Sequence, residues 1–350
     1  MSITSDNAKE HLREKLLQDI TAGKSYDALQ YIQSFIARKK KGFGHQLISS
    51  LIFEGAMILI QNGGSVEAGA LLLWYIKGGA GEEFAFKINK TASLTLGNEE
   101  FCDLDSTIVL LESVSRDKIV PLVDAVYIPI QKIFVKKYEI SMDTADGILL
   151  HNLKRFESIC ADVFESAKDW ISATKCYIKL YNVVKIIYCV DNWASNGHER
   201  EYPMFFSRVI LQLLAENRVH LAADVLQLSQ KEYSSLSVHS LSPHSSDGYH
   251  AAWHVAIILT ELAGLNNNIA EKQRVFQALH QQYSPIIAIV DKKLLTILVK
   301  IAAKVFLLQP RTASSGLDPM ALMRNLMGGS GGSGGGADAI GDIVRNLLRR

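Results

Sequence analysis

The sequence predicts an all-α protein, an α-solenoid built from helix pairs of the tetratricopeptide type. Apolar residues recur every three or four positions along most of the 350-residue chain, which is the spacing of one face of an α-helix. Short polar or Gly-containing breaks divide this pattern into segments. A segment with alanine at its third position opens three of the predicted helices, at residues 26–32, 171–177 and 220–226. Helices with a single apolar stripe cannot bury it alone, so successive pairs should stack.

The first two helix pairs occupy the N-terminal part of the chain. Leu12, Leu16 and Ile20 mark a helix over residues 5–21, and the pattern resumes over residues 26–39 after a break at Ala22-Gly23-Lys24. A longer helix carries an apolar stripe from Ile48 to Leu59 and stops at Asn62-Gly63-Gly64-Ser65. A further apolar helix then runs through Leu71, Leu72 and Ile76.

The next segment is less regular. Gly78-Gly79-Ala80-Gly81 predicts a turn and not a phosphate-binding loop, because Glu82-Glu83 follows in place of Lys-Ser or Lys-Thr. Helices are expected over residues 82–92, 106–114 and 118–137. We expect Asp103 or Asp105 to cap the second of these, Pro121 to lie in the first turn of the third, and Pro129 to kink or break it.

The remaining body of the chain predicts further helix pairs around one polar insertion. Residues 232–248 are rich in serine, and Leu236 and Val238 alternate with polar residues, so this segment is either a short strand or a loop. The helices are expected over residues 145–166, 170–190, 201–217, 219–230, 249–264, 269–282 and 286–308.

The C-terminal segment, residues 310–350, has a different composition. Gly/Ser-rich residues 328–336 predict a flexible link between two short amphipathic helices that share an apolar-Arg-Asn-Leu-apolar core, and an engineered linker with an appended peptide is the alternative. The second helix carries apolar side chains on one face and arginines near its end. We therefore divide the chain into an N-terminal half (1–140), a C-terminal half (141–309) and this tail.

Composition excludes several classes of protein. The net charge is +1, so the chain as a whole has no field that would attract nucleic acid or an anionic membrane. The cysteines are far apart and form no Cys-x-x-Cys pair, which predicts buried thiols in a reducing compartment. Residues 286–308 are too interrupted by lysines for a membrane span, and residues 1–10 lack the apolar core of a secretion signal. These features favour a cytosolic location.

The search for catalytic motifs favours a binding protein over an enzyme. His250 and His254 lie one helical turn apart, but the Glu of a zinc-protease motif is missing between them, so no metal, catalytic residue or cofactor is predicted. The basic run from Arg38 to Lys41 either faces solvent at a helix end or docks an acidic protein. A stack of helices without a site motif is usually a binding scaffold.

Several short segments resemble one known family. The Ala-Gly-x-x-Tyr-x-Ala core at Ala22 to Ala28, the segment Leu51-Ile52-Phe53-Glu54-Gly55-Ala56, Phe205-Phe206-Ser207-Arg208 and the Leu-Met-Gly-Gly at Leu326 to Gly329 are similar to the Golgi to ER traffic protein 4 family. The resemblance extends from about residue 12 to 309 and is nearly absent between 77 and 137. The chain departs from the family pattern at Ser25 and Leu29.

The resemblance implies a non-enzymatic adaptor for delivery of tail-anchored membrane proteins to the ER. Its implied partners are a targeting ATPase, docked by N-terminal helices, and a ubiquitin-like-domain partner, bound by the C-terminal half and its β-hairpin insertion. Carried over to this chain, the ATPase site comprises Arg13, Lys15, Arg38 and Lys39, and the second site comprises Leu236, Val238 and Tyr249. The alternatives are a helical subunit of a proteasome-lid or signalosome type of complex and a metal-dependent enzyme that uses His250 and His254.

Overall fold

The computed structural model describes residues 5–39, 43–80, 103–114, 116–137, 147–233, 248–265 and 268–308. Within these ranges the regular elements are all helical and no strand occurs, so the predicted all-α class is confirmed. The chain divides into two compact units, residues 1–180 and 181–350. The division that we expected at residue 140 stays a prediction.

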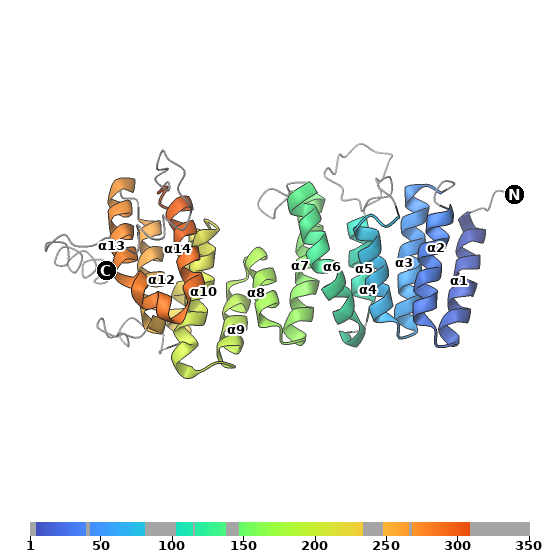
Figure 1. Ribbon diagram of the computed structural model, residues 1–350, viewed down its shortest axis with the longest axis horizontal. Coiled ribbons are helices and arrows are strands. Elements are labelled where there is room, and N and C mark those ends of the chain that lie inside the picture. Colours follow the sequence, from blue (N-terminus) through green and yellow to red (C-terminus); the bar gives the residue numbers. More distant parts are fainter. Residues whose placement is uncertain are drawn as a thin grey trace. The chain divides into compact units, whose positions relative to one another are not determined.

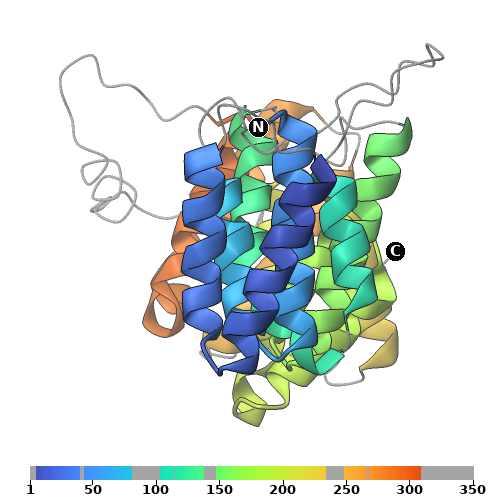
Figure 2. The ribbon, with the colours of Figure 1, turned by 90° about the vertical axis from the view of Figure 1, so that its right-hand side faces the viewer.

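The first unit is a double row of helices (Figures 1 and 2). Helices α1, α3, α5 and α7 pack in one row, helices α2, α4 and α6 pack in the other, and α8 packs on α7. This arrangement buries the stripe of each helix against its neighbours, as the spacing predicted. The bounds are α1 Ser5–Thr21, α2 Ser25–Lys39, α3 His45–Gln61, α4 Ser65–Ile76, α5 Asp103–Ser113, α6 Arg116–Lys137, α7 Gly147–Ser166 and α8 Trp170–Lys179.

The predicted turns between these helices are confirmed where they are described. Gly23 and Gly63 have φ of 74° and 89°, which favours glycine, and they reverse the chain between α1 and α2 and between α3 and α4. Residues 77–80 form the turn expected at the Gly-rich segment. The helix expected over residues 82–92 lies outside the described residues.

The predicted cap of α5 is wrong. Asp103 and Asp105 both lie in the first turn of the helix, where a negative charge interacts favourably with the helix dipole. The Asp103 side chain is fully buried and accepts hydrogen bonds from Ser49 (2.7 Å) and His45 (3.2 Å) of α3. Asp105 accepts a hydrogen bond from Asn152 of α7. Both carboxylates therefore join neighbouring helices.

Two of the expected helices differ from prediction. Helix α6 begins at Arg116, so Pro121 lies beyond its first turn, and it continues through Pro129 to Lys137, so no break occurs there. The single helix expected over residues 170–190 is two helices, because α8 ends at Lys179 and α9 starts at Val183. Tyr181 lies between them at a φ of 56°, and the Asn182 side chain accepts a hydrogen bond from the backbone N–H of Lys185 at 3.2 Å. Asn182 therefore caps the start of α9, and this signal marks a helix boundary that the apolar spacing did not reveal.

The second unit is built around α10, which packs on α9, α11, α12 and α14 (Figure 1). Most of its side chains are buried, including the whole run from Pro203 to Ser207. The bounds are α9 Val183–Ala194, η3 Glu199–Glu201, α10 Tyr202–Ala215, α11 Val219–Glu232, α12 Gly248–Gly264, α13 Ile269–Val290 and α14 Lys292–Lys304. The strand predicted within residues 232–248 and the tail from residue 309 fall outside the described residues.

The last helix boundary differs from prediction. Helix α13 runs through Pro285 to Val290, and the chain breaks at Asp291 instead. Asp291 is extended, with φ of −150° and ψ of 98°, and its carboxylate accepts a hydrogen bond from the backbone N–H of Lys293 at 2.9 Å. The pattern over residues 286–308 therefore belongs to two helices. Within the described ranges, none of the helices is both long and apolar enough to cross a membrane.

A buried polar cluster joins α6, α7 and α8. The Glu157 carboxylate on α7 accepts hydrogen bonds from Lys179 (2.8 Å), Tyr127 (3.2 Å) and Gln131. The side chain of Glu157 is 2% exposed, and that of Lys179 is 28% exposed. The Cys176 thiol donates to the Tyr127 hydroxyl at 3.3 Å, and burial raises the pKa of both groups. The buried carboxylate of Glu157 is tolerated between the helices because several donors bind it at once.

Candidate protein-binding surfaces

The N-terminal surface is formed by α1 and α2. Leu12 and Leu16 of α1 are buried, and His11 lies against α2, where its ring is 3.2 Å from the Tyr31 hydroxyl and its centroid 6.3 Å from that of Phe35. These contacts determine which side of α1 faces α2. They also determine where the predicted basic residues point.

The four predicted ATPase-binding residues are available to solvent but do not form one cluster. Arg13 and Lys15 are about 200° apart around α1, at 100° per residue, so they lie on opposite flanks of the helix. Lys15 is partly neutralised by an ion pair with Asp19 at 2.8 Å. Arg38 and Lys39 are exposed in the last turn of α2, where cations favour the helix dipole.

The C-terminal surface includes Tyr249, the one residue of the second predicted site that is described. Tyr249 lies in the first turn of α12, is half-buried, and donates a hydrogen bond to Glu201 at 3.3 Å. Leu236 and Val238 lie outside the described residues. The second predicted site stays a prediction, of which the structure describes Tyr249 alone.

An aromatic cluster at the base of the insertion was missed by sequence reasoning. Tyr233, the last described residue before the insertion, packs against Tyr202 (centroids 5.9 Å apart) and Phe206 (5.5 Å), and Phe206 packs against Trp253 (6.5 Å). Tyr202 donates a hydrogen bond to Asp191. Burial, aided by the Asp191 charge, raises the pKa of Tyr233 to about 12, so its hydroxyl stays neutral. Aromatic residues on both sides of the serine-rich segment were the available signal.

Close packing also holds the other end of the insertion. A Cβ added to Gly248 would lie 2.8 Å from the Val290 side chain and 2.9 Å from the Ile286 carbonyl oxygen, both on α13. Only glycine allows α12 to begin this close to α13. The two ends of the insertion are therefore anchored to buried parts of the second unit.

The Phe-Phe-Ser-Arg segment has a structural role. Phe205 packs edge-on against Trp193 with centroids 4.8 Å apart, and the Ser207 hydroxyl donates to the Pro203 carbonyl at 2.7 Å. Arg208 donates to Asp291 at 2.9 Å and so ties α10 to the joint between α13 and α14. These side chains support the C-terminal surface from within.

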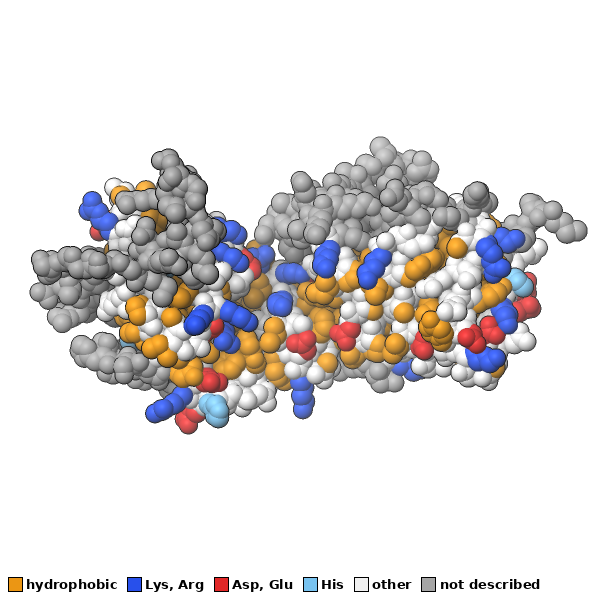
Figure 3. Space-filling view, in the orientation of Figure 1, with side chains coloured by type: hydrophobic (Ala, Val, Ile, Leu, Met, Phe, Trp, Pro, Cys, Tyr) orange, Lys and Arg blue, Asp and Glu red, His pale blue; other side chains and the backbone are white. Residues whose placement is uncertain are grey.

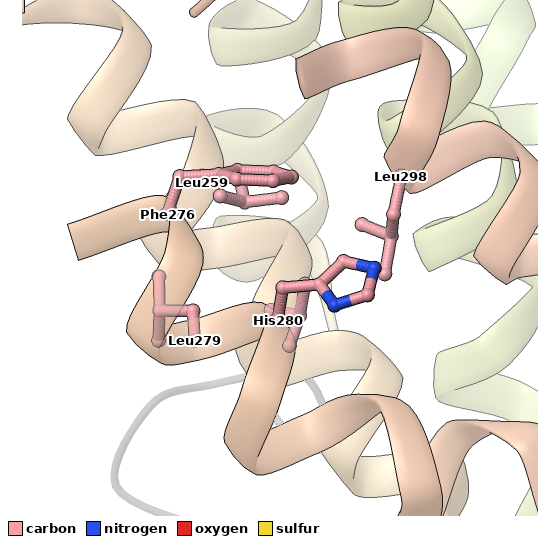
Figure 4. Close-up of a pocket in the computed structure, with 6 residues that line it drawn as sticks. Leu259, Phe276, Leu279, His280 and Leu298 are labelled. Carbon is pink, nitrogen blue, oxygen red and sulfur yellow. The ribbon is translucent and has the colours of Figure 1, made fainter. Parts of the chain in front are cut away.

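A narrow apolar recess lies between α12, α13 and α14 (Figure 4). The His280 ring points toward Leu298 of α14, and its Nδ1 lies 3.1 Å from the Ser284 hydroxyl. The recess is too narrow for a water molecule, and burial lowers the pKa of His280. The recess is a packed helix joint rather than a ligand pocket.

The two histidines of the alternative metal-enzyme hypothesis lie on α12. His254 is half-buried, and its pKa is lowered by burial and then by the neighbouring His250. In the described ranges no three His, Cys, Asp or Glu side chains are grouped as metal ligands. Ser49, His45 and Asp103 are also close together, but Ser49 donates to the carboxylate and not to the imidazole. That order does not activate a serine nucleophile.

The comparison with family models agrees with the resemblance found in the sequence. The family model described as Golgi to ER traffic protein 4 matches residues 152–328, just over half of the chain. Among solved structures, the chain is similar to one titled "Crystal structure of C. therm. Get4", with 15% identity and a TM-score of 0.49 over 92% of this chain and 96% of that chain. No curated protein matches the chain.

Proposed function

The chain belongs to the Golgi to ER traffic protein 4 family, and on this premise we propose that it is a non-enzymatic adaptor in the delivery of tail-anchored membrane proteins to the ER. The adaptor acts in the cytosol. It bridges a targeting ATPase to a sorting complex that contains a ubiquitin-like-domain partner.

One observation carries this proposal: the family match over residues 152–328, which begins within α7 and includes α8 and all of α9 to α14. The side-chain chemistry is in keeping with it. The charged groups that meet inside the described part of the chain, at Asp103, Glu157 and Asp291, are occupied in joining helices. Because these groups are used in packing, we assign binding of other proteins to the exposed surface of the helices.

The mechanism requires only two binding surfaces on one chain. Holding the ATPase close to a substrate-loaded partner raises the effective concentration for handover to the millimolar range. The adaptor also favours one nucleotide state of the ATPase if it binds that state more tightly, since a ligand shifts an equilibrium only by its difference in affinity.

We assign ATPase docking to the exposed basic residues of α1 and α2, and partner binding to Tyr249 and the insertion that precedes it. The opposite positions of Arg13 and Lys15 on α1 make separate substitutions informative. The flank whose reversal weakens binding is the one that faces the ATPase.

The test is the affinity of purified full-length protein for the targeting ATPase, measured at several salt concentrations. Arg13→Glu and Lys15→Glu together should weaken binding and flatten its salt dependence, because like charges then meet across the interface. Binding of the ubiquitin-like partner should not change. The single variants, measured next, identify the flank.

The matched control is Lys132→Glu together with Lys154→Glu, which reverses two exposed cations on α6 and α7 of the same unit. Its ATPase affinity should equal that of the unmodified protein. Unchanged affinity in the Arg13 and Lys15 double variant would exclude this docking face. Recovery of proteasome-lid or signalosome subunits from cytosol, with no ATPase, would replace the adaptor proposal with its alternative.

A further inference from the structure

Helix α14 divides cleanly into a buried and an exposed side. Leu294, Leu295, Leu298 and Ile301 are buried. At 100° and 1.5 Å per residue, the exposed side chains lie within an arc of about 140° and a length of about 18 Å. The exposed residues of the helix are Lys292, Lys293, Thr296, Val299, Lys300, Ala303 and Lys304. The surface of α14 is therefore a strip with four cations, and the helix contains no acidic residue.

The charges of this strip are not explained by folding. Among the described residues, the ion pairs involve none of these four ammonium groups. The carboxylate next to them in sequence, Asp291, is bound by Arg208 and by the backbone N–H of Lys293. Lys292 and Lys293 also lie at the N-terminus of α14, where the helix dipole disfavours cations. Of the four lysines, only Lys304 lies in the last turn, where the helix dipole favours a cation.

Exposed apolar side chains accompany the lysines. Val299 is 41% exposed, Leu307 just beyond the helix is 64% exposed, and Ile289 at the end of α13 is 84% exposed. In Figure 3, lysine and arginine side chains lie beside hydrophobic ones over α10 and α14. Long lysine stems with apolar neighbours suit a boundary between charged headgroups and an apolar interior.

We propose that the exposed strip of α14 binds the surface of a membrane that contains anionic lipids. Lysine presents a compact charge on a flexible stem, so it can follow mobile headgroups without a fixed geometry. The contact is peripheral, because α14 keeps its apolar side against α10 and α13. This inference goes beyond the adaptor function and does not depend on it.

The sequence after α14 favours a lipid surface over an acidic peptide as the occupant. Residues 338–350 combine an apolar residue at every third or fourth position with Arg345, Arg349 and Arg350, and the two acidic residues, Asp338 and Asp342, stand before the first of these arginines. This is the pattern of a helix that lies in a membrane interface. Weak membrane signals usually act in pairs, and here the second follows the first in the same C-terminal part of the chain.

The test is co-sedimentation of the full chain with vesicles of phosphatidylcholine alone or mixed with phosphatidylserine. Binding should require phosphatidylserine and fall as salt increases. Lys300→Gln should lower the partition constant about fivefold, the effect expected for one lysine near an anionic surface. Substitution of all four strip lysines by Gln should reduce binding to the level seen with neutral vesicles.

The matched control replaces four exposed lysines elsewhere, Lys24, Lys154, Lys175 and Lys231, by Gln. It removes the same total charge and should bind as the unmodified protein does. Equal binding by the control and the strip variant, both folded by circular dichroism, would overturn the proposal. It would also be overturned if phosphatidylserine vesicles are not bound while a soluble polyglutamate peptide binds through the same lysines, since the strip would then dock protein.

Discussion

Replacing Lys179 by Met should destabilise the first unit through the carboxylate that it leaves behind. The substitution removes an ammonium group 2.8 Å from Glu157, whose side chain is 2% exposed. Removing one partner of a fully buried ion pair costs about 3–5 kcal/mol. Because Lys179 is 28% exposed and Tyr127 and Gln131 still donate to the carboxylate, we expect a loss of about 2–3 kcal/mol. In a unit of this size, that lowers the melting temperature by about 5–10 °C.

The assay is urea unfolding followed by circular dichroism. Lys175→Met, one turn earlier on α8 and exposed, should change stability by less than about 0.5 kcal/mol. Equal losses in the two variants would refute the reasoning.

Three further predictions concern other joints. Arg208→Met should cost about 1–2 kcal/mol, because Asp291 is 9% exposed and loses its ion pair; unchanged hydrogen exchange in α14 would contradict this. Gly69→Val should cost about 1–3 kcal/mol by urea unfolding, since a Cβ there would lie 3.1 Å from atoms of α6, whereas a Cβ at Gly264, the last residue of α12, meets nothing within 4 Å, so Gly264→Ala should not destabilise the protein. Burial lowers the pKa of His280, so the unfolded chain takes up this proton first and stability should fall as the pH drops through about 6.5. His280→Leu should reduce this loss of stability at low pH. If the urea midpoint changes with pH equally in the variant and the unmodified protein, this role of His280 is refuted.

The exposure of the candidate docking residues could be anticipated from the sequence, but their arrangement could not. Arg13, Arg38 and Lys39 are exposed, as cations on helix surfaces usually are. That Arg13 and Lys15 lie on opposite flanks follows from helical periodicity, but which flank faces α2 depends on the contacts of His11. The aromatic cluster beneath the insertion joins side chains of α10 and α12 with Tyr233, which follows α11; the sequence shows these aromatic residues, but not that they pack together.

Helix ends show where local signals were insufficient. Pro129 and Pro285 stand inside continuous helices, because burial of the neighbouring turns outweighs the hydrogen bond that a proline removes. The actual breaks follow Asn182 and Asp291, whose side chains cap the next helix. Both residues were read as parts of longer apolar patterns, since a single cap is a weaker signal than periodicity.

The sequence by itself determined the all-α class, most of the helices and the turns at Gly23 and Gly63, because apolar spacing and backbone freedom are local properties. Only the tertiary structure decided the partners of the buried charges. Asp103 meets His45 across 58 residues of sequence, and Glu157 meets Lys179 across 22. A carboxylate becomes a structural joint when packing removes it from water and brings donors to it, and that depends on the stack as a whole.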